Sequence, residues 1–180
     1  MPTFSRDIKV EMEWIDDTSF EITGSLNDNV HSVHARLVVS YPDYVIREAE
    51  GGIERMPYPG FCQGAYVVLP KMIGVKIGRG FRKFLSDTLG GAESCTHLHT
   101  LVNDMATCAF QMNYYSNKRK AERANINWEA LMKSDAKRRM AVLNWVPQLR
   151  NTCYTFSEQA DKVFEEALEK EAQEASDANS

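Results

Sequence analysis

Alternating apolar and polar residues over positions 8–14, 20–26 and 33–39 predict three half-buried β-strands, because only a strand places every second side chain on one face. Turn-forming residues at Asp16-Asp17-Thr18 separate the first two stretches, which are therefore expected to form a hairpin. Strands that follow one another in sequence favour an antiparallel sheet.

Two irregular stretches interrupt this pattern. Gly24 interrupts the alternation in the second strand, where we expect a bulge or a bend. The short apolar run Tyr44-Val45-Ile46 is a candidate for a fourth strand. Two prolines in Met56-Pro57-Tyr58-Pro59-Gly60 exclude a central strand and indicate a structured loop, with Cys62 at its exit.

Apolar residues three and four positions apart predict helices in the rest of the chain. We expect a helix over 81–89 that stops at Gly90-Gly91, a second over 98–112 and a third over 126–146 that Pro147 ends. On the second helix, Cys108 is expected to be a small core residue.

The fold class predicted is α+β, an antiparallel sheet of three to four strands packed against several helices. The chain has 180 residues, 43% of them apolar, which suits one hydrophobic core. We therefore expect a single α+β domain over 1–164. Residues 165–180 are acidic and rich in Ala and Ser, and we expect them to be a frayed or disordered tail.

Charge and hydropathy narrow the function classes. A net charge of −4 argues against nucleic-acid binding, which needs a basic surface. No stretch approaches the roughly 18 apolar residues of a membrane span, and the N-terminus does not have the pattern of a secretory signal. We therefore expect a cytoplasmic protein with free thiols and no membrane partner.

Four side chains carry the candidate chemistry. Cys95 lies where the second helix begins, so that unpaired amides and the helix dipole favour its thiolate. His97 follows within the first turn, and His99 lies four residues after Cys95, so spacing leaves open which imidazole joins the thiol. His31 shares the inward parity of its strand, and Cys62 follows the proline loop. Taken singly, an inward histidine or a free cysteine is most often structural.

Three functions fit this set. Imidazole and thiolate ligands suit zinc or iron, so the leading hypothesis is a metal-dependent lyase or hydrolase that acts on a small organic acid. In it, His31, Cys62 and Cys95 bind the metal, and His97 is a ligand or an acid/base. The alternatives are a metal-free enzyme with Cys95 as nucleophile and a non-catalytic scaffold that transfers metal or an iron–sulfur cluster. The partners expected are a small-molecule substrate and, as an open alternative, a second copy in a homodimer.

The motif Ser94-Cys95-Thr96-His97-Leu98, with Gly24-Ser25-Leu26-Asn27-Asp28, the 56–62 loop and Leu149-Arg150-Asn151-Thr152-Cys153, resembles a bacterial family catalogued as domain of unknown function 2889. The resemblance implies that Thr96 and Cys153 are also motif positions, as substrate-binding residues, and it favours His97 over His99. Ser94 and Tyr154 stand where the family pattern has glycine and histidine. The order of His31, Cys62 and Cys95 is also similar to the ligand order in scaffold proteins of iron–sulfur assembly.

Overall fold

The structure is a computed structural model that describes residues 1, 3–92 and 94–177. The chain divides into two compact units, Met1–Met112 (unit 1) and Asn113–Ser180 (unit 2). The boundary falls within the segment 1–164 that the sequence assigns to one domain. Among the described residues, the buried members of the main hydrophobic core lie between Phe20 and Met112, with partly buried residues such as Val10 and Trp14 packed against them, so this core belongs to unit 1.

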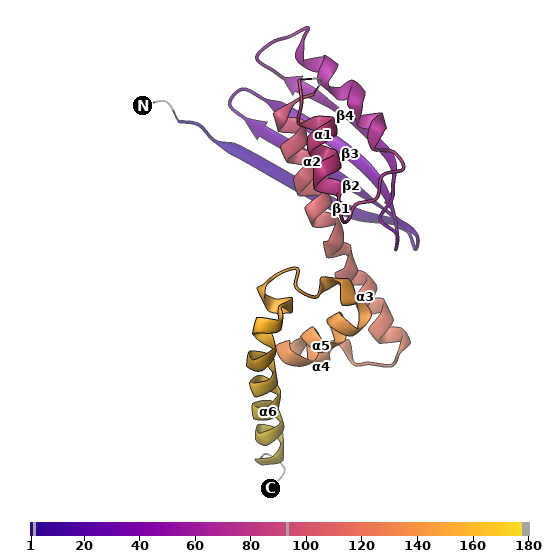
Figure 1. The fold of residues 1–180 in the computed structure, drawn as a ribbon, viewed down its shortest axis with the longest axis vertical. Coiled ribbons are helices and arrows are strands. Elements are labelled where there is room, and N and C mark those ends of the chain that lie inside the picture. The colour runs from indigo at the N-terminus through magenta and orange to yellow at the C-terminus, as the bar shows by residue number, and fades with distance from the viewer. Residues whose placement is uncertain (2, 93, 178–180) are drawn as a thin grey trace. The chain divides into compact units, whose positions relative to one another are not determined.

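Unit 1 contains a four-stranded antiparallel sheet in the order β1-β2-β3-β4 (Figure 1). The predicted α+β class, the antiparallel arrangement and the first hairpin are confirmed, and the fourth strand is present. The strands are β1 (Arg6–Asp16), β2 (Ser19–Asp28), β3 (Ser32–Ser40) and β4 (Ile46–Arg55). Strand β4 begins at Ile46 and continues to Arg55. Gly51 and Gly52 allow this pairing because they fit closely against the backbone and side chain of His34, where larger residues would clash. These glycines break the alternation that identifies a strand.

The expected bulge at Gly24 is wrong. Gly24 pairs in regular register with Val10 on one side and Ala35 on the other, and the irregularity in this hairpin lies between Trp14 and Asp16. A Cβ at Gly24 would lie 2.7 Å from Sδ of Met105. The glycine therefore lets a helix approach the sheet and does not bend the strand.

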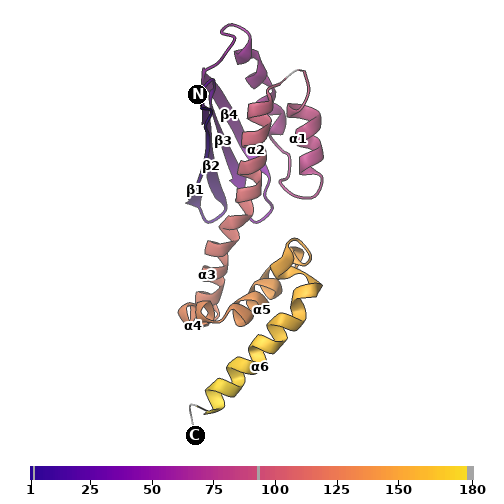
Figure 2. The ribbon, with the colours of Figure 1, turned by 90° about the vertical axis from the view of Figure 1, so that its left-hand side faces the viewer.

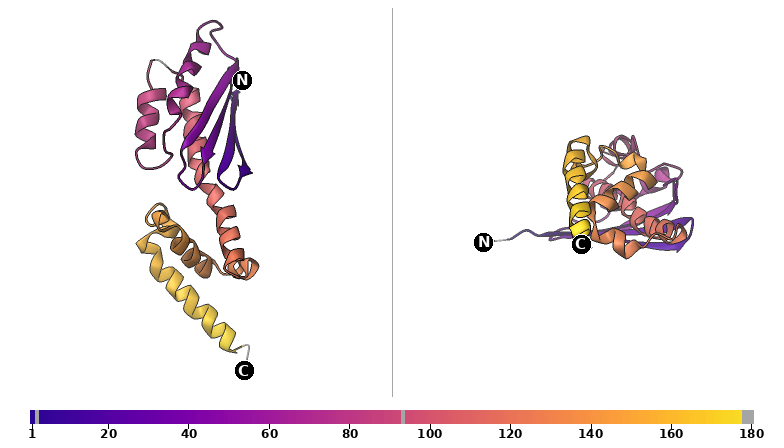
Figure 3. Two further views of the ribbon diagram at one scale, coloured as in Figure 1. Left: turned by 90° about the vertical axis from the view of Figure 1, so that its right-hand side faces the viewer. Right: turned by 90° about the horizontal axis from the view of Figure 1, so that it is seen from below.

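Helices cover one face of the sheet. Helix α2 crosses the sheet, α1 packs beside α2, and the 3₁₀ helix η1 packs on β4 (Figure 2). No helix of unit 1 lies on the opposite face among the described residues (Figure 3, left). The bounds are η1 (Cys62–Met72), α1 (Phe81–Leu89), α2 (Thr96–Ala109) and η2 (Phe110–Met112).

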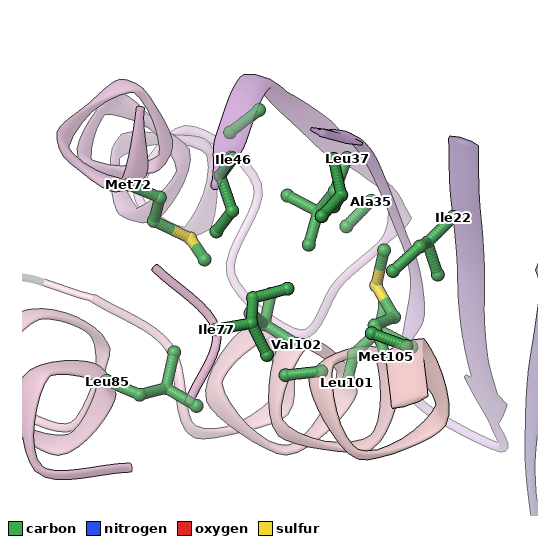
Figure 4. Packing of buried hydrophobic residues seen from close by; sticks show 14 of the residues in the cluster. Ile22, Ala35, Leu37, Ile46, Met72, Ile77, Leu85, Leu101, Val102 and Met105 are labelled. Atoms are coloured by element: carbon green, nitrogen blue, oxygen red, sulfur yellow. The ribbon is translucent and has the colours of Figure 1, made fainter. Parts of the chain in front are cut away.

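The core lies between the sheet and these helices. Leu37 on β3 and Leu101 on α2 are fully buried and face each other across this layer (Figure 4). Cys108 differs from its predicted core position. It is only partly buried, and this burial still raises the pKa of its thiol. Because α2 contributes buried residues to this core along its length, the core fixes the position of the helix, including the end that carries Cys95.

Unit 2 consists of helices. They are α3 (Asn113–Arg123), α4 (Trp128–Lys133), α5 (Asp135–Trp145) and α6 (Asp161–Asp177), with short 3₁₀ turns η3 (Pro147–Leu149), η4 (Tyr154–Phe156) and η5 (Glu158–Ala160). The helix predicted over 126–146 is broken at Ser134, whose hydroxyl accepts a hydrogen bond from the Lys137 amide and caps α5. Helix α6 crosses the predicted tail boundary at residue 164. No helix in the described ranges is long and apolar enough to span a membrane.

A partly buried ion network anchors the start of α6. Arg139 is almost fully buried and donates hydrogen bonds to the Asp161 carboxylate at 2.6 Å and to the Ser157 carbonyl at 3.0 Å. Arg150 binds the same carboxylate. These two arginines lower the pKa of Asp161 to about 2, so the carboxylate stays ionised and holds α6 to α5.

Candidate functional site

The hairpin connection between β2 and β3 positions His31. Asp28 ends β2, and its Oδ1 accepts hydrogen bonds from the amides of Val30 at 2.8 Å and His31 at 2.7 Å. This side-chain turn fixes the backbone just before β3 begins. Arg55, at the end of β4, adds hydrogen bonds to the carbonyls of Asp28 and His31. The His31 ring is thus held on a rigid turn, with 16% of its side chain exposed.

The carboxylate of Asp28 also orients the His31 ring. The Asp28 side chain is fully buried, and its Oδ1 lies 3.1 Å from Nδ1 of His31. Arg6 donates to Oδ2 from Nε at 3.0 Å and from Nη2 at 2.7 Å. Burial alone would raise the pKa of Asp28, but the hydrogen bonds from Val30, Arg6 and His31 outweigh it, and the pKa falls well below its usual range. An ionised Asp28 can only accept a hydrogen bond, so Nδ1 of His31 is the donor in this contact, and Nε2 is the ring nitrogen left for another partner.

His97 approaches His31 from the first turn of α2. The two rings stack with centroids 3.7 Å apart and planes 28° apart. Burial, and then the neighbouring charges of His31 and Arg6, lower the pKa of His97 below its usual 6.5. The imidazole of His97 is therefore neutral at pH 7, the form that binds a metal or accepts a proton.

Cys95 completes this cluster as the N-cap residue of α2. Its Sγ lies 3.5 Å from Nδ1 of His97. The sequence left His97 and His99 as alternatives, and the structure places His97 against the thiol. His99 lies further along the same helix and is half-buried; its backbone amide donates to the Cys95 carbonyl at 2.9 Å, but no hydrogen bond of its ring with the Cys95 thiol is found among the described residues.

One group of described residues has the spacing of a metal site. Potential ligand atoms of Asp28, His31 and His97 all lie within 4.8 Å of one another. Cys62 and Cys95 do not belong to this group of three. Because the oxygens of Asp28 already accept hydrogen bonds from Arg6 and the turn amides, its role beside the two imidazoles is to orient His31.

Cys62 and Cys95 line a common hollow of about 650 Å³, together with Thr96. Tyr66 lies beside both thiols, and burial, followed by the charges of Cys95 and Cys62, raises the pKa of its hydroxyl. That hydroxyl is buried without a hydrogen-bond partner in the described part of the chain. Cys95 thus belongs both to the histidine cluster and to the hollow. The structure brings the two distant cysteines to the same place.

Cys153 lies in unit 2, where it is exposed and lines a separate hollow with Asn151 and Tyr154. The two residues that sequence reasoning missed are Asp28 and Arg6. Asp28 had a usable signal, since an aspartate three residues before a histidine at the end of a strand is typical of a side-chain turn. Arg6 had none, because only the pairing of β1 with β2 brings it opposite Asp28.

Comparison with known proteins places unit 1 in a family. A family profile described as "Protein of unknown function (DUF2889)" matches residues 4–111, which is nearly all of unit 1. Searches of the curated proteins and of the solved structures gave no match. The match contains every residue of the histidine and cysteine cluster. The chain therefore belongs to the DUF2889 family.

Proposed function

We propose that unit 1 is a small metal-dependent enzyme, a lyase or hydrolase, that binds one zinc or iron ion at His31 and His97. One observation carries the proposal: potential ligand atoms of His31 and His97, from different elements, lie within 4.8 Å of each other and of Asp28, whose ionised carboxylate orients the His31 ring. A histidine that donates from one nitrogen to a carboxylate and offers the other as a ligand is the usual arrangement at protein metal sites. Cys95 and Cys62 provide thiolates next to this pair.

Each side chain has a defined task in this proposal. Asp28 holds the His31 ring, with Arg6 keeping the carboxylate ionised. His97 stays neutral and serves as a ligand or as an acid/base beside Cys95. A bound zinc or iron ion supplies a Lewis acid that polarises a carbonyl or activates water, which suits a small organic acid as substrate. The open hollow of about 650 Å³ at Cys95 gives a small substrate room next to the thiol.

Metal analysis of the purified protein tests the proposal. We expect about one equivalent of zinc or iron per chain, prepared without chelator and, for iron, under anaerobic conditions. His31→Ala and His97→Ala should each abolish most of this content. His34→Ala and His99→Ala are matched controls, since these two histidines lie outside the cluster, and they should retain it. A folded wild-type protein free of both metals would refute the metal function.

The 3.5 Å contact between Cys95 and His97 supports a second candidate, a metal-free enzyme with Cys95 as nucleophile. A neutral His97 can accept the thiol proton of Cys95, which is the N-cap residue of α2. In metal-free protein, Cys95 should then be alkylated by iodoacetamide faster than Cys108, and His97→Ala should slow the alkylation of Cys95 while leaving that of Cys108 unchanged. Equal rates for the two thiols would exclude an activated Cys95.

A further inference from the structure

The hollow beside Cys95 has two chemically different sides. Its apolar side comes from the loop before η1 and includes Tyr58 and Phe61. Its polar side is formed where α2 begins and includes Ser94, Cys95 and Thr96. A ligand that fills this space must therefore combine an apolar body with a polar group at one end.

The aromatic side chains on the apolar side are unusually exposed. Phe61 is 83% exposed and Tyr58 is 68% exposed. The loop that carries them is nevertheless ordered by its own hydrogen bonds, since the amides of Phe61 and Cys62 both donate to the Tyr58 carbonyl. A rigid loop that holds two rings in solvent at the edge of a hollow is suited to pack against a planar ring.

Unused hydrogen-bond donors mark the polar side. The hydroxyl of Ser94 is buried and has no partner in the described part of the chain. Helix α2 begins at Thr96, and the Cys95 side chain makes no capping hydrogen bond, so the first-turn amides of this 14-residue helix lack a side-chain cap. Uncapped amides and the positive end of the helix dipole favour an anionic group, and a carboxylate accepts from several donors at once.

We propose that this hollow binds an aromatic carboxylic acid, with its ring against Tyr58 and Phe61 and its carboxylate at Ser94 and the start of α2. This inference rests on the proposed function, because it places the acid beside Cys95 and His97, and it narrows the substrate from a small organic acid to an aromatic one. The contacts with Tyr58 and Phe61 select an aromatic acid over an aliphatic one. The contacts of the carboxylate with Ser94 and the start of α2 orient the acid toward Cys95 and His97.

Binding measured by titration calorimetry on the full chain tests the inference, with cinnamate as the probe. Two analogues remove one feature each: 3-cyclohexylpropionate has no aromatic ring, and cinnamyl alcohol has no carboxylate. Each should bind about three- to tenfold more weakly than cinnamate, the range expected for loss of an aromatic contact or of charge-assisted hydrogen bonds. Equal affinity for cinnamate and either analogue, or the absence of saturable cinnamate binding, would overturn the inference.

Variants locate the site. Phe61→Leu and Ser94→Ala should weaken cinnamate binding, and Ser94→Ala should leave cinnamyl alcohol unaffected. Val67→Ala is the matched control, because Val67 is 74% exposed on η1 and does not line the hollow. Thermal melts verify that each variant is folded. Unchanged cinnamate affinity in folded Phe61→Leu would place the ligand elsewhere and refute the site.

Metal analysis on the same samples separates this inference from the metal function. Metal-free protein that binds cinnamate with the expected ring and carboxylate dependence would refute the metal function alone. Metal-loaded protein without cinnamate binding would refute the aromatic-acid site alone.

Discussion

The imidazole rings of His31 and His97 stack with their centroids 3.7 Å apart, although one ring belongs to a strand connection and the other to a helix. Two imidazolium ions would repel each other at this distance, so the arrangement is stable only when at least one ring is neutral. A metal ion shared by both rings, or a proton held by one of them, meets this condition.

Asp28→Asn should weaken metal binding about 10- to 100-fold, because the amide removes the charge that orients His31 and stabilises the proton on its Nδ1. The measurement is competition with a chelating dye. Asp7→Asn, an exposed aspartate on β1, is the matched control and should bind as the wild type does. Unchanged affinity in folded Asp28→Asn would show that His31 is not a ligand oriented by this carboxylate.

His97 should titrate below pH 6.5 in metal-free protein, because burial and the charge of His31 disfavour its protonated form. Since the unfolded chain then takes up this proton at a higher pH than the folded protein, the free energy of unfolding should fall as the pH drops below about 6.5. NMR of the imidazole carbons gives the midpoint. His31→Ala should raise it by removing the repulsion, and a wild-type midpoint at or above 6.5 would contradict the prediction.

Gly24→Ala should destabilise unit 1 by about 1–3 kcal/mol, because the added methyl group would lie 2.7 Å from Sδ of Met105 and 2.9 Å from Cδ1 of Leu101. Urea unfolding measures the loss. Gly78→Ala is the control, since its Cβ would meet no atom closer than 4.0 Å. Equal stability of the two variants would mean that α2 does not pack this closely on the sheet.

Removing the residues after Gln173 should leave the thermal midpoint nearly unchanged, because the described residues of this segment are exposed. The ion network of Arg139 and Asp161, which anchors α6, lies at its other end. Differential scanning calorimetry of the truncated and full-length chains makes the comparison. A large drop in the midpoint would mean that the end of the chain docks, for example on a second copy.

The sequence alone determined the local elements of unit 1. The period-two pattern located the first three strands, and the spacing after Gly78 located α1 and α2, because each side-chain pattern reflects one buried face. The same side-chain pattern failed in two places, where a strand contains glycines and where a helix cap interrupts a continuous apolar stripe. Gly51 and Gly52 hid the length of β4, and the cap formed by Ser134 divided a helix that hydropathy made continuous.

The sequence also indicated that Cys95 lies at a helix start and that His97 or His99 is its neighbour. The family resemblance favoured His97, and the tertiary structure placed that side chain against the thiol. Only the tertiary structure stacked His31 on His97 and put Cys62 in the same hollow as Cys95. It also supplied the role of Asp28, which the sequence had only as the last residue of a stretch that carries the family resemblance, and the role of Arg6. The physical reason is that these contacts depend on strand register and on the packing of α2 across the sheet. Both are set by long-range burial, which a one-dimensional pattern does not contain.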